Sequence, residues 1–284
     1  MNAVGKLVLP IGGESPDFEG GSIFFVGNAT VILRYAGFTI LTDPNFLHQG
    51  EHVHLGYGIR SARRVNPAME LEDLPPLDLI VLSHMHEDHF DRIVEQKLDK
   101  HLPIVTTPHA VKKLKKKGFK ATYAIDTWQT QLVIKGNAHL HITAMPGIHG
   151  PRPLQALLPP VMGSLLEFRT EMEEQPAFRL YISGDTLLHQ EFYEIPKRYP
   201  DIDLALVHLG GTKILGILLT MDGKQGAKAI EVLSPDTAIP IHYNDYTVMK
   251  SPLEEFVQAI HAAGLHDRIH YLKHGDTYEF KLSA

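Results

Sequence analysis

One stretch constrains the fold of this chain more than any other: Leu77–Phe90, which reads LDLIVLSHMHEDHF. Its apolar half is typical of a buried β-strand, and it ends in His84, His86, Asp88 and His89. Alternate residues of an extended chain point the same way, so His84 and His86 can leave the sheet edge side by side and bind one metal ion. Asp88 and His89 come where the chain turns into a helix and can point elsewhere. The spacing therefore favours two metal sites.

The pattern of strands and helices predicts an α/β protein. Residues 22–46 predict three successive strands, residues 47–76 a polar loop, and residues 187–199 a helix. Strands and helices then alternate to the end of the chain, which suggests two mixed sheets packed together with helices outside. No low-complexity linker marks a boundary, so a single domain over residues 1–284 is expected.

A faint internal repeat supports a two-sheet arrangement. Residues 37–44 resemble residues 177–186, each a strand that ends at an aspartate. Residues 75–84 resemble residues 199–208, each a strand that ends at a histidine. Two such halves would bring four polar strand ends to one shared edge.

Composition excludes several classes of protein. With 33 acidic and 27 basic residues the chain has no general attraction to nucleic acid, and none is expected as a partner. No segment has the length and apolarity of a membrane span, and the N-terminus does not read as a signal peptide. A cytoplasmic protein without stable membrane insertion is expected. The absence of cysteine leaves only nitrogen and oxygen as metal ligands, which suits zinc, manganese or iron.

Other predicted strands also end in metal-ligand residues. His149 lies between two glycines at the end of one strand, Asp185 follows Gly184 at the end of a second, and His242 ends a third. Binding residues are expected at such junctions, where loops are held by a rigid scaffold. Asp43 ends a fourth strand and could orient a ligand histidine by contacting that histidine without contacting the metal.

These motifs, in this order, resemble the metallo-β-lactamase superfamily. The stretches GNATVILRYAGFTILTDP, LPPLDLIVLSHMHEDHFD and IPIHY are most similar to the branch of N-acyl-phosphatidylethanolamine phospholipase D and L-ascorbate-6-phosphate lactonase. The similarity covers roughly residues 22–245. It implies a four-layer αβ/βα sandwich of two mixed sheets flanked by helices, with a binuclear metal centre at one edge.

The resemblance also assigns the ligands of two divalent ions, for which zinc is expected and Mn²⁺ or Fe²⁺ are alternatives. The residues implied for the first ion are His84, His86 and His149. Those implied for the second are Asp88, His89 and His242, with Asp185 as the bridge. Asp88 is the expected catalytic residue, which would orient a metal-activated hydroxide or take its proton. Asn28 departs from the family pattern, in which a histidine is commoner at this position.

The function expected from these features is hydrolysis of an ester bond, of phosphodiester or lactone type, in a small molecule. A metal-binding protein of the same fold without turnover and a di-iron oxidoreductase are the alternatives. A homo-oligomer is compatible with the hydrolase. His208 and Tyr243 are candidates for contacting developing charge or protonating the leaving group. Residues 149–163 are a candidate apolar wall or lid over the site.

Several further charged or polar residues have an ordinary interpretation. His48, His52 and His54 are expected in an exposed polar loop. Arg60, Arg63 and Arg64 could bind an anionic group of the substrate. The ordinary interpretation is that they are solvated surface arginines.

Overall fold

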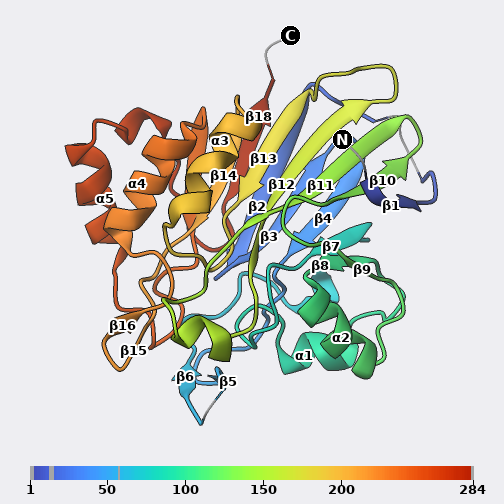
Figure 1. Ribbon diagram of the computed structural model, residues 1–284. Coiled ribbons are helices and arrows are strands. Elements are labelled where there is room, and N and C mark those ends of the chain that lie inside the picture. The colour runs from blue at the N-terminus through green and yellow to red at the C-terminus, as the bar shows by residue number, and fades with distance from the viewer. Residues whose placement is uncertain (1–2, 13–15, 57, 283–284) are drawn as a thin grey trace.

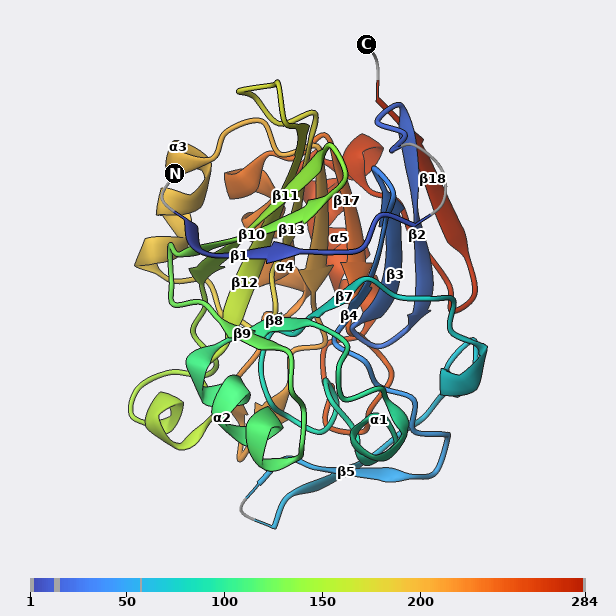
Figure 2. The ribbon, with the colours of Figure 1, turned by 90° about the vertical axis from the view of Figure 1, so that its right-hand side faces the viewer.

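The computed structural model describes residues 3–12, 16–56 and 58–282, and its core is two seven-stranded sheets that face each other (Figures 1 and 2). The first sheet has the strand order β18 (Thr277–Lys281), β2 (Gly20–Gly27), β3 (Thr30–Tyr35), β4 (Phe38–Thr42), β7 (Leu79–Val81), β8 (Ile104–Thr106), β9 (Thr122–Ala124). The second has the order β1 (Ala3–Val8), β10 (Thr130–Lys135), β11 (Ala138–Pro146), β12 (Met162–Thr170), β13 (Phe178–Ile182), β14 (Leu204–His208), β17 (Thr237–Ile241).

Helices cover the outer face of each sheet. Their bounds are α1 (Arg92–Lys97), α2 (Pro108–Lys116), α3 (Ile195–Arg198), α4 (Gly223–Leu233) and α5 (Leu253–Ala262). In the first half, Val94 of α1 and Leu114 of α2 share a buried cluster with Ile80 of β7. In the second half, Ile230 of α4 and Phe256 of α5 pack with strand residues of β13 and β14. The predicted four-layer α/β sandwich is therefore confirmed.

The apolar layer between the sheets joins the two halves. Phe178 of β13 stacks on Phe280 of β18, with ring centroids 4.6 Å apart, and lies 4.9 Å from the ring of Tyr35 in β3. Residues buried from both sheets continue this cluster along the interface. Because buried aliphatic and aromatic side chains each contribute about 1.5–3 kcal/mol, this layer supplies much of the scaffold's stability.

The expected half-repeat has a physical counterpart in the two sheets. β4 pairs in parallel with β7, and β13 pairs in parallel with β14. The backbone N–H of Asp43 donates to Val81, and that of Ser183 donates to Leu206, at corresponding positions beyond the strand ends. The four strand ends therefore meet at one edge of the sandwich, as the sequence suggested.

Two segments differ from expectation. The predicted loop at residues 47–76 contains a hairpin, β5 (His52–His54) and β6 (Arg60–Ala62), and a 3₁₀ turn at Leu71–Asp73. The predicted helix at residues 187–199 is a 3₁₀ turn, Gln190–Glu194, followed by the short α3. Proline at position 196 has no N–H to continue the hydrogen-bond ladder of the preceding turn, which explains the break.

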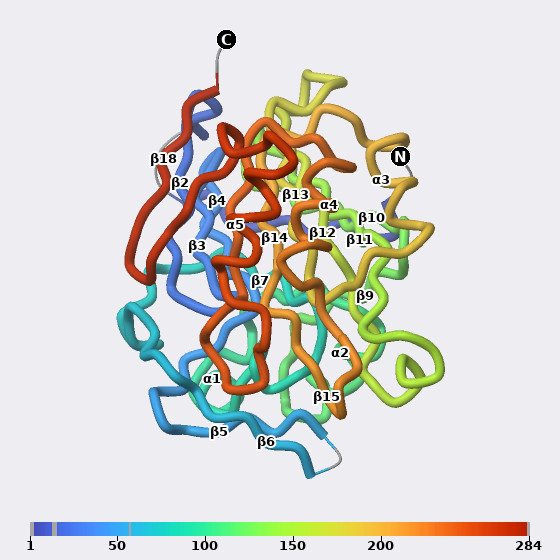
Figure 3. The backbone as a smooth tube through the Cα atoms, turned by 90° about the vertical axis from the view of Figure 1, so that its left-hand side faces the viewer, coloured from blue at the N-terminus to red at the C-terminus, as the bar shows by residue number. Residues whose placement is uncertain are grey.

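The remaining elements are small. A second hairpin consists of β15 (Lys213–Ile214) and β16 (Ile217–Leu218), and 3₁₀ turns lie at Leu154–Leu157 and His266–Arg268. The β5–β6 and β15–β16 hairpins lie at the same end of the sandwich (Figures 1 and 3). Among the described residues, every helix is too short or too polar to cross a lipid bilayer.

Candidate metal centre

The loop that follows β7 carries four of the seven predicted ligands. β7 ends at Val81, so His84 and His86 lie on this loop and not on the strand itself. Asp91 fixes the far end of the loop by accepting two hydrogen bonds from the first turn of α1, at 2.8 and 2.9 Å. Its other oxygen accepts a hydrogen bond from the backbone N–H of Leu47 at 2.9 Å. The loop is thus held between a buried strand and a capped helix.

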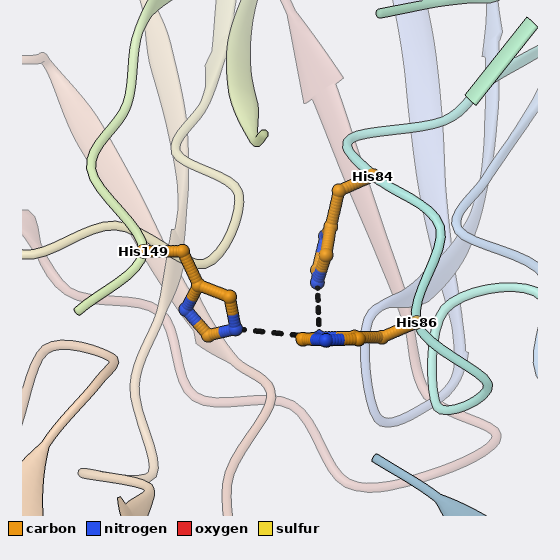
Figure 4. A group of neighbouring side chains, drawn as sticks. All are labelled: His84, His86 and His149. Atoms are coloured by element: carbon orange, nitrogen blue, oxygen red, sulfur yellow. Dashed lines mark hydrogen bonds between the residues drawn. The ribbon is translucent and has the colours of Figure 1, made fainter. Parts of the chain in front are cut away.

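Three histidine side chains converge on one point (Figure 4). His86 Nδ1 lies 2.9 Å from His84 Nε2 and 3.3 Å from His149 Nε2. Nitrogen ligands of a tetrahedral zinc ion lie roughly 3.3 Å apart, so this spacing fits a shared cation. His149 Nδ1–H donates to the carbonyl of Leu219 at 3.1 Å, which leaves Nε2 unprotonated in the neutral ring.

The protonation of these histidines also suits metal binding. Burial, together with the charges of neighbouring histidines, holds the pKa of His84 well below its usual range. Burial and the charge of His149 lower the pKa of His86 to about 3. Burial also lowers the pKa of His149 itself. All three rings are therefore neutral at pH 7 and present lone pairs, the form that binds a metal.

A second group contains Asp88, His89, Asp185 and His242, all of them buried. His89 Nε2 lies 3.4 Å from Asp185 Oδ2 and 3.8 Å from Asp88 Oδ2. His242 Nε2 lies 3.5 Å from Asp88 Oδ2, and its Nδ1–H donates to the carbonyl of Leu209 at 3.2 Å. Potential ligand atoms of the four residues all lie within 4.8 Å of one another.

Unpartnered atoms show that this second group fits a cation. Among the described residues, four of its buried atoms have no hydrogen-bond partner: Asp88 Oδ1, His89 Nε2, Asp185 Oδ1 and His242 Nε2. A buried polar atom without a partner costs about 1–3 kcal/mol, and such atoms are rare. Each of the four residues therefore keeps a buried oxygen or nitrogen available as a ligand atom, and one ligand atom from each residue lies within 4.8 Å of the others. The residues present therefore fit the metal that the sequence implies.

Electrostatics in the second group favour added positive charge. Burial opposes protonation of His89, but the charges of Asp185, Asp88 and Asp43 outweigh it and raise the pKa of His89 well above its usual range. Burial likewise opposes ionisation of Asp185, yet the charges of His242 and His89 hold its pKa well below the ordinary value. The buried carboxylates thus create a negative environment that a cation neutralises.

The two groups adjoin each other and share one cavity. The ring centroids of His84 and His89, one from each group, are 4.2 Å apart. Residues of both groups line the same small cavity, together with aliphatic side chains and Thr212: His86, Asp88, His149 and Asp185. The cavity has a volume of about 10 Å³, which is close to the space that one water molecule needs, and a group of that size would contact both groups of residues.

Asp43 lies behind the second group, where it was expected. Its Oδ1 accepts a hydrogen bond from the backbone N–H of Ser83 at 2.7 Å, and its Oδ2 lies 3.2 Å from His89 Nδ1. This contact keeps a proton on Nδ1 and turns Nε2 toward the aspartates. His208 Nε2 lies 3.5 Å from the same oxygen, and the His208 ring is fully buried. His208 therefore supports Asp43 and does not line the metal-centre cavity.

Asn28, which departs from the family pattern, joins two ligand segments. Its side-chain N–H donates to the carbonyl of Asp88 at 2.6 Å, and its own carbonyl accepts the backbone N–H of His242 at 2.7 Å. The residue has a left-handed backbone with φ of 55°, which asparagine tolerates better than most residues. Asparagine therefore suits this position for structural reasons.

Other candidates lie away from the centre. The hydroxyl of Tyr243 donates to the carbonyl of Leu272 at 3.1 Å, outside the metal-centre cavity. His48 pairs with Glu70 on the surface, and His52 and His54 are exposed.

Arg63 is the clearest departure from its two expected roles. It is buried, 3.8 Å from Asp245, and donates to the carbonyl of Asn45 at 3.1 Å, so it is neither solvated nor free to bind a substrate. One contact to the centre was not foreseen: Thr220 Oγ donates to Asp185 Oδ2 at 3.3 Å, and no motif marks this threonine.

The fold and the two groups define a class of protein: an α/β sandwich in which three histidines and an adjoining histidine–aspartate group offer potential metal ligands at one sheet edge. A family model described as "Beta-lactamase superfamily domain" matches residues 39–243, and the chain belongs to this family. The superfamily resemblance is therefore confirmed. The narrower resemblance to the lactonase and phospholipase D branch stays a prediction.

Similar proteins span nearly the whole chain. A UPF0173 metal-dependent hydrolase of Caldivirga maquilingensis is 24% identical over 90% of this chain and 96% of its own. The crystal structure of an isothiocyanate hydrolase from Delia radicum gut bacteria superposes with a TM-score of 0.75, at 22% identity, over 92% of this chain and 99% of the other. The metallo-β-lactamase fold protein YhfI of Bacillus subtilis has a TM-score of 0.60 at 13% identity and covers 92% and 100%. The two structural matches show the same fold.

Proposed function

We propose that this protein is a metal-dependent hydrolase that cleaves an ester bond, of phosphodiester or lactone type, in a small molecule. The supporting observation is the set of unpartnered buried atoms on Asp88, His89, Asp185 and His242, next to a cavity that the three-histidine group also lines. The name of the Caldivirga maquilingensis relative, a metal-dependent hydrolase, agrees with it.

The donor chemistry supports two divalent ions, and we propose zinc, with manganese or iron as alternatives. His84, His86 and His149 would hold the first, while Asp88, His89 and His242 would hold the second. Asp185 is the proposed bridge: it lies against His89, and its charge also acts on His84. When bound, such ions supply Lewis acidity and make water a nucleophile at neutral pH.

Asp88 is the proposed catalytic residue. Its Oδ1 lacks a hydrogen-bond partner among the described residues, and its side chain lines the cavity. Burial opposes its ionisation, but the charge of His89 and the contact with His242 keep its pKa below the usual value. The carboxylate is therefore ionised at neutral pH and can orient an attacking water or accept its proton. Asn28 holds the backbone of Asp88 in place by its hydrogen bond to the carbonyl.

Elemental analysis of the purified protein, paired with a panel of aryl phosphodiesters and lactones, tests this function. Turnover of at least one ester, lost on chelation and restored by a divalent ion, is expected. His84→Ala should abolish turnover, and Asp88→Asn should reduce it more than it reduces metal content. Bound metal without turnover of any ester would indicate a metal-binding protein instead. Full activity in metal-free protein would refute the proposal.

A further inference from the structure

A second cavity adjoins the metal-centre cavity, and its lining is entirely aliphatic. It has a volume of about 160 Å³. Seven described residues line it and define what we call the apolar chamber: Leu55, Ile59, Leu154, Leu157, Leu158, Ile214 and Leu219. No charged or polar side chain is among them. An engineered cavity of roughly 150 Å³ with a similar lining binds benzene, so the apolar chamber has room for a phenyl ring or a short branched alkyl group.

The apolar chamber and the metal-centre cavity share a wall. Four residues line both: Leu55, Leu158, Ile214 and Leu219. The shared leucine at position 219 also contacts the metal centre through its backbone, because its carbonyl accepts the hydrogen bond from His149 Nδ1. The metal-centre cavity has a volume of only about 10 Å³, so it holds little more than the reacting atoms, and the rest of a ligand bound there would extend into the apolar chamber.

Three segments far apart in the sequence build this chamber. Residues 55 and 59 come from the tip of the β5–β6 hairpin, residues 154–158 from the loop after β11, and residues 214 and 219 from or beside the β15–β16 hairpin. These segments gather at one end of the molecule (Figure 1). Leu55 and Ile59 also pack in a small buried cluster with Val53 and Tyr246, whereas the other five chamber residues belong to none of the buried clusters. Apolar side chains that three separate loops bring to one opening beside a metal centre are better explained by a ligand than by the core alone.

Local contacts hold these walls in place. The backbone N–H of His54 donates to Glu87 of the ligand loop at 2.6 Å, which anchors the β5–β6 hairpin. The backbone N–H of Gly150 donates to the carbonyl of Leu219 at 3.0 Å. Gly150 has a φ of 77°, and a Cβ there would lie 2.8 Å from a side-chain methyl group of Leu219 and 3.1 Å from one of Leu158, so glycine suits this close approach of the two walls.

Charge near the apolar chamber argues against an anionic tail on the substrate. Of the three arginines considered for anion binding, Arg63 is buried against Asp245, and Arg60 and Arg64 line neither cavity. A carboxylate or phosphate placed among leucines would lose its hydration without a compensating partner. The aliphatic lining therefore selects an uncharged group.

We infer that the apolar chamber binds an uncharged hydrocarbon group, about the size of a phenyl ring, on the substrate whose ester bond lies at the metal centre. That an ester bond of this substrate lies at the metal centre rests on the proposed hydrolase function. The chamber is the specificity-determining part of the site, and it favours substrates with an aryl or alkyl tail over equally long charged ones.

Binding of benzyl alcohol to the purified metalloprotein, followed by ligand-observed NMR, tests the chamber without turnover. Ile214→Ala and Leu154→Ala should each raise the dissociation constant roughly threefold to tenfold. The reason is that each methylene group buried in the contact changes a binding constant about fourfold. Leu215→Ala is the matched control, since this neighbour on the same hairpin is 97% exposed and should have no effect. Absence of binding, or binding that neither chamber variant weakens, would overturn the inference.

A kinetic comparison separates this inference from the proposed function. Ethyl 3-phenylpropyl phosphate is compared with ethyl 3-carboxypropyl phosphate, and γ-phenyl-γ-butyrolactone with γ-carboxy-γ-butyrolactone, so that only one member of each pair carries an aryl group. At least a tenfold preference in kcat/KM for the phenyl member, reduced in Ile214→Ala, is expected. Turnover with equal or reversed preference would contradict the chamber's role while leaving hydrolysis intact. Benzyl alcohol binding without turnover of any ester would support the chamber and refute ester hydrolysis.

Discussion

Replacing Asp43 by asparagine tests how the structure orients a proposed metal ligand. Asp43 Oδ1 accepts the backbone N–H of Ser83, and Oδ2 lies 3.2 Å from His89 Nδ1. Asparagine keeps the shape and can still accept from Ser83, but it then turns an NH₂ group toward His89 Nδ1. The neutral ring would have to carry its proton on Nε2, the atom that faces Asp88 and Asp185.

The expected loss is selective. Removing such an orienting partner costs roughly 10- to 100-fold in metal affinity, or about 1.4–2.7 kcal/mol. Asp43 has no direct contact with His84, His86 or His149 among the described interactions, so the affinity of the three-histidine group should stay unchanged. One binding step should therefore weaken and the other should not.

Competition against a chromophoric chelator resolves the two binding steps. The matched control is Asp267→Asn, because this aspartate has a side chain that is 92% exposed and lies outside both groups. Equal weakening of both steps in Asp43→Asn, or unchanged affinity at both, would refute the orienting role.

Three further predictions concern residues around the site. Gly150→Ala should lower the unfolding free energy by about 1–3 kcal/mol, measured by denaturant titration, because φ is 77° and the new methyl group meets Leu219. Arg63→Ala should cost about 3–5 kcal/mol in the same measurement, because it removes the buried cation 3.8 Å from Asp245 and leaves that carboxylate with only the partly buried His274 as a cationic partner; a loss below about 1 kcal/mol would contradict this. The pKa of His274 is raised, because the contact with Asp245 outweighs the opposing effect of burial. Protonated His274 therefore stabilises the fold. This stabilisation is fully present below about pH 6.5, the pKa of an unfolded histidine, and is lost as the pH rises through the pKa in the folded state. The stability difference between wild type and His274→Gln should therefore shrink from about pH 6 to about pH 9, and a constant difference would contradict it.

Strand-end chemistry explains why the candidate centre could be predicted from the sequence. Asp43, His84 and Asp185 each follow an apolar strand, and parallel strands bring such ends to one edge. The structure places all seven predicted ligands in the two adjoining groups. Whether they bind metal stays a prediction. The expectation that the first histidines lie on the strand itself was wrong, because β7 ends at Val81.

Tertiary contacts account for what the sequence did not reveal. The β5–β6 hairpin has strands of three residues, too short for a clear alternating pattern, so residues 47–76 looked like a polar loop. Arg63 looked like a surface cation, yet its partners Asn45 and Asp245 lie far from it in sequence. The apolar wall expected within residues 149–163 is present, but the other walls of its chamber come from two hairpins that no local pattern links.

One chain is expected to hold two divalent ions in adjoining groups of ligands. Anomalous diffraction from crystals of the metal-loaded protein, recorded at the absorption edge of the metal found by elemental analysis, tests it most directly. Two peaks are expected, one among His84, His86 and His149 and the other among Asp88, His89 and His242, with Asp185 between them. A single peak, or peaks remote from these seven residues, would contradict it.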